Sequence, residues 1–202
     1  MASAGPNYPT VADGAEDGFA INYDWVDVNN IKDADADYAM CSATPVIGSG
    51  DSRWLKGTAY GFAIPAGSTI NGILVEIRGW ATNDATRYTY FYDLWATKTG
   101  TRIGTNKGDA SSWGSTPQTR SYGGATDLWG TTWSVAEINA AGFGFHAHWY
   151  LVTDTGADTY LGIEFYRVTV YYTPPAGGAV KFCSVLCSKF NGVVVSKIDG
   201  VT

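Results

Sequence analysis

The two histidines, His146 and His148, are the first residues to consider for catalysis or metal binding. Because they lie two positions apart, they would share one face of a β-strand with Tyr150. A nucleophilic triad also needs a Ser or Cys and an orienting carboxylate, and a zinc site needs further ligands at suitable spacing. No Cys, Asp or Glu around the pair has ligand spacing, so we interpret both histidines as ordinary strand residues.

Three carboxylates in expected strands, Glu76, Asp93 and Glu164, could supply the acid pair of a glycoside hydrolase. Their separations do not follow from the sequence, and outward-facing charges on half-buried strands explain them equally well. The chain has no phosphate-binding loop and no dinucleotide fingerprint. We therefore expect no catalytic residues, no cofactor and no enzyme activity.

Asp33, Asp35 and Asp37 repeat the carboxylate spacing that opens an EF-hand loop. The sixth position of such a loop would be Tyr38, where glycine is required, and the twelfth would be Thr44, where glutamate is required. The EF-hand interpretation therefore fails. A looser Ca²⁺ site formed by the three aspartates stays open, beside the simpler interpretation of a solvated acidic turn.

Aromatic side chains on a flat sheet face could bind a sugar, because Tyr and Trp rings can stack on pyranose rings. The candidates for glycan stacking are Trp80, Trp95 and Trp113, and Phe91 and Tyr150 are further candidates. Aromatic residues are also enriched in protein interfaces, and we expect most of these rings to belong to the core or to an interface.

The composition indicates the class of fold and argues against several kinds of partner. Of the 202 residues 45% are hydrophobic and 16% are charged, and 25 are Gly and 13 are Tyr, which favours short strands and turns. The net charge of −6 argues against a nucleic-acid partner. We find no signal peptide and no apolar run of membrane-spanning length, so we expect synthesis in the cytoplasm and no membrane partner.

The three cysteines, Cys41, Cys183 and Cys187, make an odd number. On one extended strand Cys183 and Cys187 would lie about 13 Å apart, beyond the roughly 7 Å between Cα atoms that a disulfide tolerates. We therefore expect reduced thiols.

An antiparallel, jelly-roll-like β-sandwich over residues 18–173 is the fold that would position these side chains. Its clearest part is 60–77, where strands expected over 53–64 and 70–82 meet at a corner formed by Pro65 and Gly67. In the second strand Ile73, Val75 and Ile77 share one face, and Leu74, Glu76 and Arg78 share the other.

The next expected strand, 88–96, places Tyr88, Tyr90 and Tyr92 on one face. Aromatic residues lie on both of its faces, so alternation does not say which face is buried. The Gly-rich residues 98–118 are expected to form a long exposed excursion.

The last third of the sandwich should contain its one short helix. Ser134 and Glu137 have the spacing of a helix-capping box, which predicts a helix beginning there. Two long strands, over 143–152 and 160–173, are expected to be joined by a hairpin-like connection.

Three segments are expected to lie outside the sandwich. Residues 1–17 are interpreted as an N-terminal arm, and 174–178 as a Pro/Gly linker. Residues 179–202 repeat a unit that begins with Lys, and Asn-Gly and Asp-Gly turns predict a β-hairpin appendage. Such a ribbon needs a surface to pack on, which makes its apolar residues interface candidates: Phe190, Val193, Val195, Ile198 and Val201.

Several motifs in order resemble a widespread family of β-rich proteins encoded by tailed bacteriophages and prophages. They include GFAIPAGSTINGI at 61–73, GGATDLWG at 123–130, and Ile138-Asn139 followed by Phe143-Gly144. The resemblance covers roughly residues 19–173. It implies a virion structural protein, without catalytic or cofactor residues.

These features lead us to expect a non-enzymatic component on the exterior of a phage virion. The leading hypothesis is a homo-oligomeric capsid decoration protein that contacts other virion proteins, either major capsid or tail subunits, through its C-terminal appendage. The alternative is a carbohydrate-binding module of a tail fibre or adhesin, based on the aromatic sheet faces. A secreted bacterial sandwich protein is a third hypothesis, which the missing signal peptide counts against.

Overall fold

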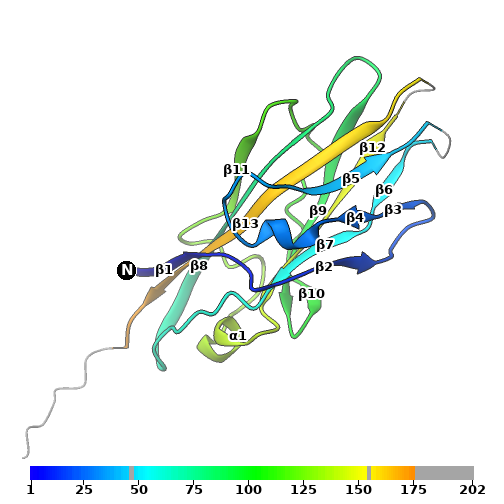
Figure 1. Cartoon of the computed structure of the whole chain (residues 1–202). Helices are drawn as coiled ribbons and strands as arrows, with labels where there is room; N and C mark the ends of the chain where they lie inside the picture. Colours follow the sequence, from blue (N-terminus) through cyan, green and yellow to red (C-terminus); the bar gives the residue numbers. More distant parts are fainter. Residues whose placement is uncertain (46–47, 154–155, 176–202) are drawn as a thin grey trace, which may run out of the picture.

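Two β-sheets packed face to face make up the fold (Figure 1). The computed structural model describes residues 1–45, 48–153 and 156–175. Within these ranges the long strands pair in antiparallel fashion, and a short parallel pair joins β3 (Asn22–Tyr23) and β6 (Gly50–Ser52). The expected fold class, an antiparallel jelly-roll-like β-sandwich with one short α-helix, is confirmed.

The first sheet has six strands in the described part of the chain. Its order is β11-β8-β13-β5-β4, and β1 also pairs with β13. The strands are β1 (Ala2–Asn7), β4 (Trp25–Val26), β5 (Ala39–Ala43), β8 (Thr69–Ala81), β11 (Gln118–Gly123) and β13 (Thr159–Thr173).

The second sheet has seven strands in the described ranges. Its order is β10-β9-β12-β6-β3, with β7 paired to β12 and β2 paired to β7. The strands are β2 (Val11–Glu16), β3 (Asn22–Tyr23), β6 (Gly50–Ser52), β7 (Trp54–Thr58), β9 (Tyr88–Lys98), β10 (Thr101–Ile103) and β12 (Gly144–Val152).

The inner faces of the two sheets form one hydrophobic core. Ile73, Val75 and Ile77 point inward from β8 and are fully buried, as their alternation predicts. Phe145 and Trp149 meet them from β12 and are also fully buried. The outward-facing residues of the same strands are therefore the ones available for function.

Two short helices, η1 (Val28–Ile31) and α1 (Val135–Asn139), lie among the described residues. The predicted capping box at α1 is confirmed, because Ser134 Oγ accepts a hydrogen bond from Glu137 N (3.2 Å) and Glu137 Oε2 accepts one from Ser134 N (2.7 Å). In the described ranges no helix has the length and apolar character of a membrane span.

The corner around Pro65 is longer than predicted. The strand expected over 53–64 ends at Thr58, because Ala59 and Gly61 adopt positive φ angles of 58° and 67° that interrupt the ladder. The side chain of Asn139 takes over as a pairing partner. Its amide donates to Ile64 O and accepts from Ile64 N, both at 3.0 Å.

The N-terminal residues differ from the expected arm. Residues 2–16 contribute β1 to the six-stranded sheet and β2 to the seven-stranded sheet. Their small and acidic side chains have low intrinsic strand preference, and pairing with β13 and β7 overrides it. The strand expected over 18–25 is reduced to β3 and β4, which lie in different sheets.

Two connections also differ from expectation. The strands β12 and β13 belong to different sheets, so the link between them is not a hairpin; each strand has an apolar face, and the two faces meet across the core. Residues 98–118 are not wholly exposed, because Trp113 is fully buried.

Several predictions concern the end of the chain. The expected linker is described as far as Pro175, and the appendage with Phe190, Val193, Val195, Ile198 and Val201 lies outside the described residues. Cys183 and Cys187 lie there too. Cys41 is a free, buried thiol whose pKa is raised by burial.

Candidate functional site: a tyrosine row on the seven-stranded sheet

A row of tyrosines lies on the outer face of the seven-stranded sheet. Tyr88, Tyr90 and Tyr92 come from β9, and Tyr150 is the cross-strand partner of Tyr90 on β12. Centroids of neighbouring rings are 5.1 Å apart for Tyr88 and Tyr90, 5.7 Å for Tyr90 and Tyr92, and 5.8 Å for Tyr92 and Tyr150. Tyr92 is the most open of the four, at 40% exposure. We call these four residues the tyrosine row.

A β-bulge in β9 shapes the site. Asp93 pairs with His148 and Phe91 pairs with Trp149, so Tyr92 is an extra residue without a partner of its own. The bulge lets Tyr92 reach solvent while Asp93 faces His148 on the same sheet face. An aromatic ring and a carboxylate thus come together from consecutive positions.

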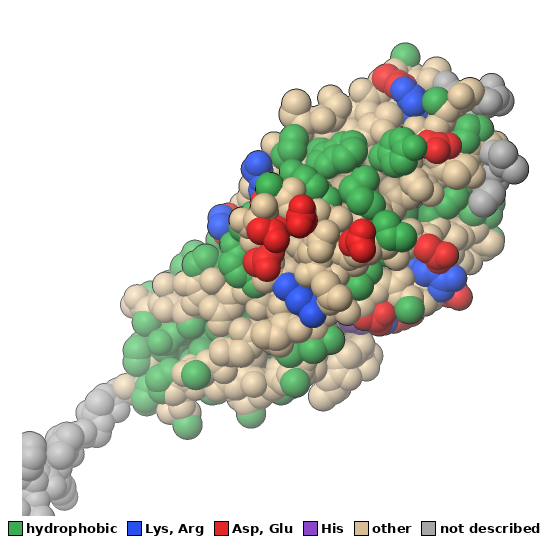
Figure 2. Space-filling model, in the orientation of Figure 1, with side chains coloured by type: hydrophobic (Ala, Val, Ile, Leu, Met, Phe, Trp, Pro, Cys, Tyr) green, Lys and Arg blue, Asp and Glu red, His purple; other side chains and the backbone are tan. Residues whose placement is uncertain are grey.

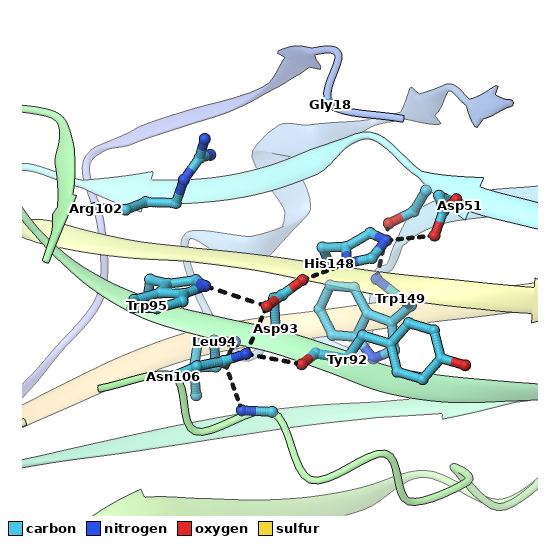
Figure 3. A network of polar contacts seen from close by, with 12 residues as sticks. Gly18, Asp51, Tyr92, Asp93, Leu94, Trp95, Arg102, Asn106, His148 and Trp149 are labelled. Carbon is cyan, nitrogen blue, oxygen red and sulfur yellow. Dashed lines mark hydrogen bonds and ion pairs between the residues drawn. The ribbon is translucent and has the colours of Figure 1, made fainter. Parts of the chain in front are cut away.

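A polar network centred on His148 lies beside the row (Figure 3). His148 is 1% exposed, and its Nδ1 lies 2.9 Å from Asp93 Oδ2 while its Nε2 lies 2.8 Å from Asp51 Oδ1. Asp93 Oδ1 also accepts hydrogen bonds from Trp95 Nε1 (3.2 Å) and from Asn106 Nδ2 (2.5 Å). The network therefore joins β6, β9 and β12 to the segment that follows β10.

The hydrogen bonds of this network are limited by the number of its donors and acceptors. A neutral imidazole has one N–H, so it can donate to only one of two carboxylates, whereas an imidazolium donates to both. Burial raises the pKa of Asp93, but hydrogen bonds from His148 and Trp95 and the charge of His148 outweigh it, and the net pKa of Asp93 is lowered. His148 thus lies between two carboxylates, with one carboxylate oxygen at each ring nitrogen.

The side of the network away from the row is covered by aromatic residues. Phe19 stacks on the His148 ring, with centroids 3.9 Å apart and planes 18° apart, and Trp54 lies next to both. Arg102 in turn lies over the Trp54 ring at 4.1 Å. The tyrosine row, in which Tyr92 is exposed and the other three rings are half-buried, thus ends at Phe19 and Trp54.

His146 lies on the same strand face as His148 but in a different environment. Burial and the charge of Lys56 lower the pKa of His146 to about 4, and its Nδ1 has no partner among the described residues. Lys56 is paired with Asp13 (2.9 Å) and Glu16 (2.7 Å). Neither histidine belongs to a group of three or more metal-binding side chains in the described ranges.

The outer face of the six-stranded sheet is organised differently. Trp80 lies across Gly162, its partner on β13, and a Cβ built on Gly162 would be 2.7 Å from Trp80 Nε1. Tyr38 contacts the Trp80 ring edge to face at 6.2 Å. On the view in Figure 2, hydrophobic side chains gather over β5 and β13 next to a group of acidic side chains.

The three candidate glycosidase carboxylates are separated by the fold. Glu76 is bound to Arg167 through two hydrogen bonds of 2.9 Å, and Glu164 to Arg78 at 2.6 Å, both on the six-stranded sheet. Asp93 lies on the other sheet, bound to His148. Each carboxylate therefore has a structural partner.

The three tryptophans considered as candidates for glycan stacking lie in three different environments. Trp113 is fully buried against Phe91 and Trp149, and Phe91 is fully buried too, so neither ring can stack a glycan; both belong to the core, as expected for most of the candidates. Trp80 is half-buried on the six-stranded sheet. Trp95 is half-buried and donates to Asp93, which places it beside the tyrosine row.

Sequence reasoning identified Tyr150 but did not select Tyr88, Tyr90 and Tyr92 as site residues. The signal was the run of tyrosines at every second position of one strand. Asp51 and Asn106 carried no signal, because only the fold brings them to His148 and Asp93.

The three aspartates considered for Ca²⁺ are all exposed. Asp35 Oδ1 accepts a hydrogen bond from Asp37 N at 2.9 Å, which is the geometry of an Asx-turn. They form no cluster of three metal-binding side chains in the described part of the chain. The acidic-turn interpretation accounts for the contact that the structure shows.

A shallow hollow of about 480 Å³ lies between β2 and β4, away from the tyrosine row. Its polar lining includes Arg53 and Asp24, which bind each other at 2.5 Å, and Arg53 also donates to Ala15 O. These groups satisfy one another, and the aromatic residue of the lining, Trp25, is itself buried.

Comparisons with known proteins add little to this geometry. No protein-family model and no curated protein matches the chain. Among solved structures the chain is similar to a carbohydrate-binding module described as "CBM4 structure and function", with 13% identity, 78% of this chain and 92% of that chain covered, and a TM-score of 0.39. The likeness is one of β-sandwich architecture.

Proposed function

We propose that this protein is a non-catalytic carbohydrate-binding module that stacks sugar rings on the tyrosine row. The observation that carries the proposal is the series of ring contacts that links Tyr88, Tyr90, Tyr92 and Tyr150 on two adjacent strands, with Tyr92 open to solvent. Tyr rings offer an apolar face to the C–H groups of a sugar and a hydroxyl to its polar edge.

The position of the row supports recognition by a preformed surface. Tyr92 and Asp93 are placed by the bulge, and Asp93 is held by His148, Trp95 and Asn106. A surface whose rings are already fixed loses little conformational entropy on binding. Phe19 and Trp54 close one end of the row, so a ligand would extend from that end toward Tyr88.

Glycan-array screening of the whole chain, followed by calorimetric titration, tests this function. Tyr92→Ala and Tyr150→Ala should each weaken binding at least roughly tenfold, which corresponds to about 1.4 kcal/mol. Trp80→Ala removes an aromatic side chain from the other sheet and is the matched control, with affinity expected to stay unchanged. Glycan binding that depends on Trp80 and not on the tyrosines would contradict the proposal.

The place of the protein on a virion is a separate proposal. It is supported by the motifs at 61–73 and 123–130, and a tail fibre or adhesin is the location that a glycan-binding module would suit. Labelling the protein in purified particles for electron microscopy tests it, and absence from particles would reject it.

The hypothesis of a capsid decoration protein anchored by residues 179–202 stays a prediction. Its test is the incorporation into particles of a variant that lacks residues 176–202. Undiminished incorporation would rule out the anchor.

A further inference from the structure

We infer that the tyrosine row takes uncharged sugars and rejects carboxylated or sulfated ones, with Asp51 as a specificity-determining residue. The inference rests on the proposed function, because it concerns the ligand of the same surface. It follows from the charges around the row and from an acceptor atom at its edge.

The acceptor belongs to Asp51, the cross-strand partner of Tyr150. Asp51 Oδ1 binds His148 Nε2 at 2.8 Å, whereas Oδ2 accepts no hydrogen bond from the described residues. The side chain is 19% exposed, so water reaches it. A carboxylate oxygen in this position can accept a hydrogen bond from a sugar hydroxyl, and such charge-assisted bonds are strong.

The same oxygen would repel an anionic ligand. Two carboxylates, Asp51 and Asp93, lie beside the row, and the single imidazole between them can carry at most one positive charge. Their charges act at short range on a partly dehydrated surface, where screening by salt is weaker than in open solvent. A carboxylate or sulfate on the sugar would be placed against this negative potential.

The cations nearest to this face are already bound to protein carboxylates. Lys56 binds Asp13 and Glu16, Arg102 binds Glu16 at 2.8 Å, and Arg87, next to Tyr88, binds Asp84 through two nitrogens. Recognition of an acidic sugar usually relies on Arg or Lys groups that can bind its carboxylate or sulfate. Here these Arg and Lys side chains already bind carboxylates of the protein itself.

A matched pair of glycans separates charge from shape. The probe is a carboxylated polysaccharide and its carboxyl-reduced form, which share one backbone, titrated against the whole chain at low and physiological salt. We expect the reduced form to bind at least tenfold more tightly, and the ratio to shrink as salt rises. Tighter binding of the carboxylated form, dependent on Tyr92, would overturn the charge inference and leave the proposed function standing.

Asp51→Asn tests the residue itself. The amide oxygen can still accept from His148, so the variant should fold, while its charge and its hydroxyl acceptor are removed. We expect the preference for the uncharged form to fall several-fold, whereas Asp33→Asn, an equal charge change at an exposed turn, should leave the ratio unchanged. An unchanged ratio in Asp51→Asn would refute its role, and binding of neither glycan form in a Tyr92-dependent way, together with a negative array, would refute the proposed function as well.

Discussion

The two outer faces of the sandwich each contain a β-bulge, but the bulges do different things. In β13 the extra residue is Glu164, which turns a 7% exposed carboxylate toward Arg78. In β9 the extra residue is Tyr92, which turns an aromatic ring toward solvent. One bulge completes an ion pair within the sheet, and the other leaves a side chain without a structural partner of comparable strength.

The side-chain contacts on the two outer faces also differ. On the six-stranded sheet Glu76 binds its direct cross-strand partner Arg167, and Trp80 covers its partner Gly162. Such pairs between adjacent strands stabilise a sheet. On the seven-stranded sheet His148 gathers side chains from two other strands, and Asn106 joins them from a loop. Convergence of several segments beside open rings is the better sign of a binding site.

The largest effect that separates the faces should come from His148→Leu. It leaves Asp51 and Asp93 without their shared donor, and because both are mostly buried we expect a loss of about 2–4 kcal/mol in the free energy of unfolding. Urea unfolding measures it. Arg78→Leu, the counterpart on the other sheet, should cost less, about 1–2 kcal/mol, because Arg78 is 37% exposed and water can reach Glu164 after the change.

A larger loss from Arg78→Leu than from His148→Leu would reverse the comparison. His148→Gln serves as the control, because its amide N–H groups can still donate to one of the two carboxylates, and it should cost less than His148→Leu.

The next effect is an acid sensitivity of the seven-stranded face. The pKa of His146 is lowered from 6.5 to about 4 in the folded protein, so the unfolded chain takes up the proton first as pH falls. The stability should therefore decline between pH 6.5 and 4, by up to about 3 kcal/mol. Urea unfolding as a function of pH measures the slope.

His146→Gln should remove that slope, and a slope that persists in this variant would contradict the assignment. Asp93 contributes in a lower window. Its folded pKa is lowered, so its stabilising contribution is complete above the ordinary value of 3.8 and is lost as pH falls through the folded pKa.

A smaller effect should separate stability from binding. Trp80→Ala uncovers Gly162 and should cost about 1–2 kcal/mol of stability, because a half-buried indole is removed. Tyr92→Ala should cost less, about 0.5 kcal/mol, since the ring is 40% exposed. Thermal unfolding measures the stability of both variants, and glycan titration measures their affinity. An equal loss of glycan affinity in both variants would contradict the assignment of binding to the tyrosine row.

The smallest effect concerns the acidic turn. Asp35→Ala removes one Asx-turn hydrogen bond at an exposed position, and we expect a cost of about 0.5 kcal/mol or less. A ligand that binds only the folded state raises its stability. Because we expect no Ca²⁺ to bind this turn, neither Ca²⁺ nor a chelator should shift the unfolding temperature. A shift that Asp35→Ala abolishes would restore the Ca²⁺ hypothesis.

Local patterns in the sequence were sufficient to predict which face of β8 is buried and where α1 begins. Ile73, Val75 and Ile77 recur at every second position, and Ser134 and Glu137 have capping-box spacing, so the signal lies within a few residues. Trp113 could not be placed in the same way, because its burial depends on Phe91 and Trp149, which come from two other strands.

The candidate site could be predicted only in part, because part of it depends on how whole strands pair. The alternation of Tyr88, Tyr90 and Tyr92 was evident, but aromatic residues on both faces of the strand hid which one is solvent-exposed. The register that pairs Asp93 with His148 depends on a bulge, and bulges follow from the pairing of whole strands. The strands β1 and β2 were missed because their residues favour no strand locally.

The pairing of β1 with β13 has a mechanical consequence. Ala2 lies opposite Tyr172 and Asn7 opposite Val168, so the two strands leave the sandwich at the same end (Figure 1). Opposite forces applied at residues 1 and 173 would load the hydrogen bonds between β1 and β13 one after another, beginning at Ala2 and Tyr172, and not all at once. Tension on both ends of the described chain would therefore peel β1 away at low force while the tyrosine row, anchored in the other sheet, stays assembled.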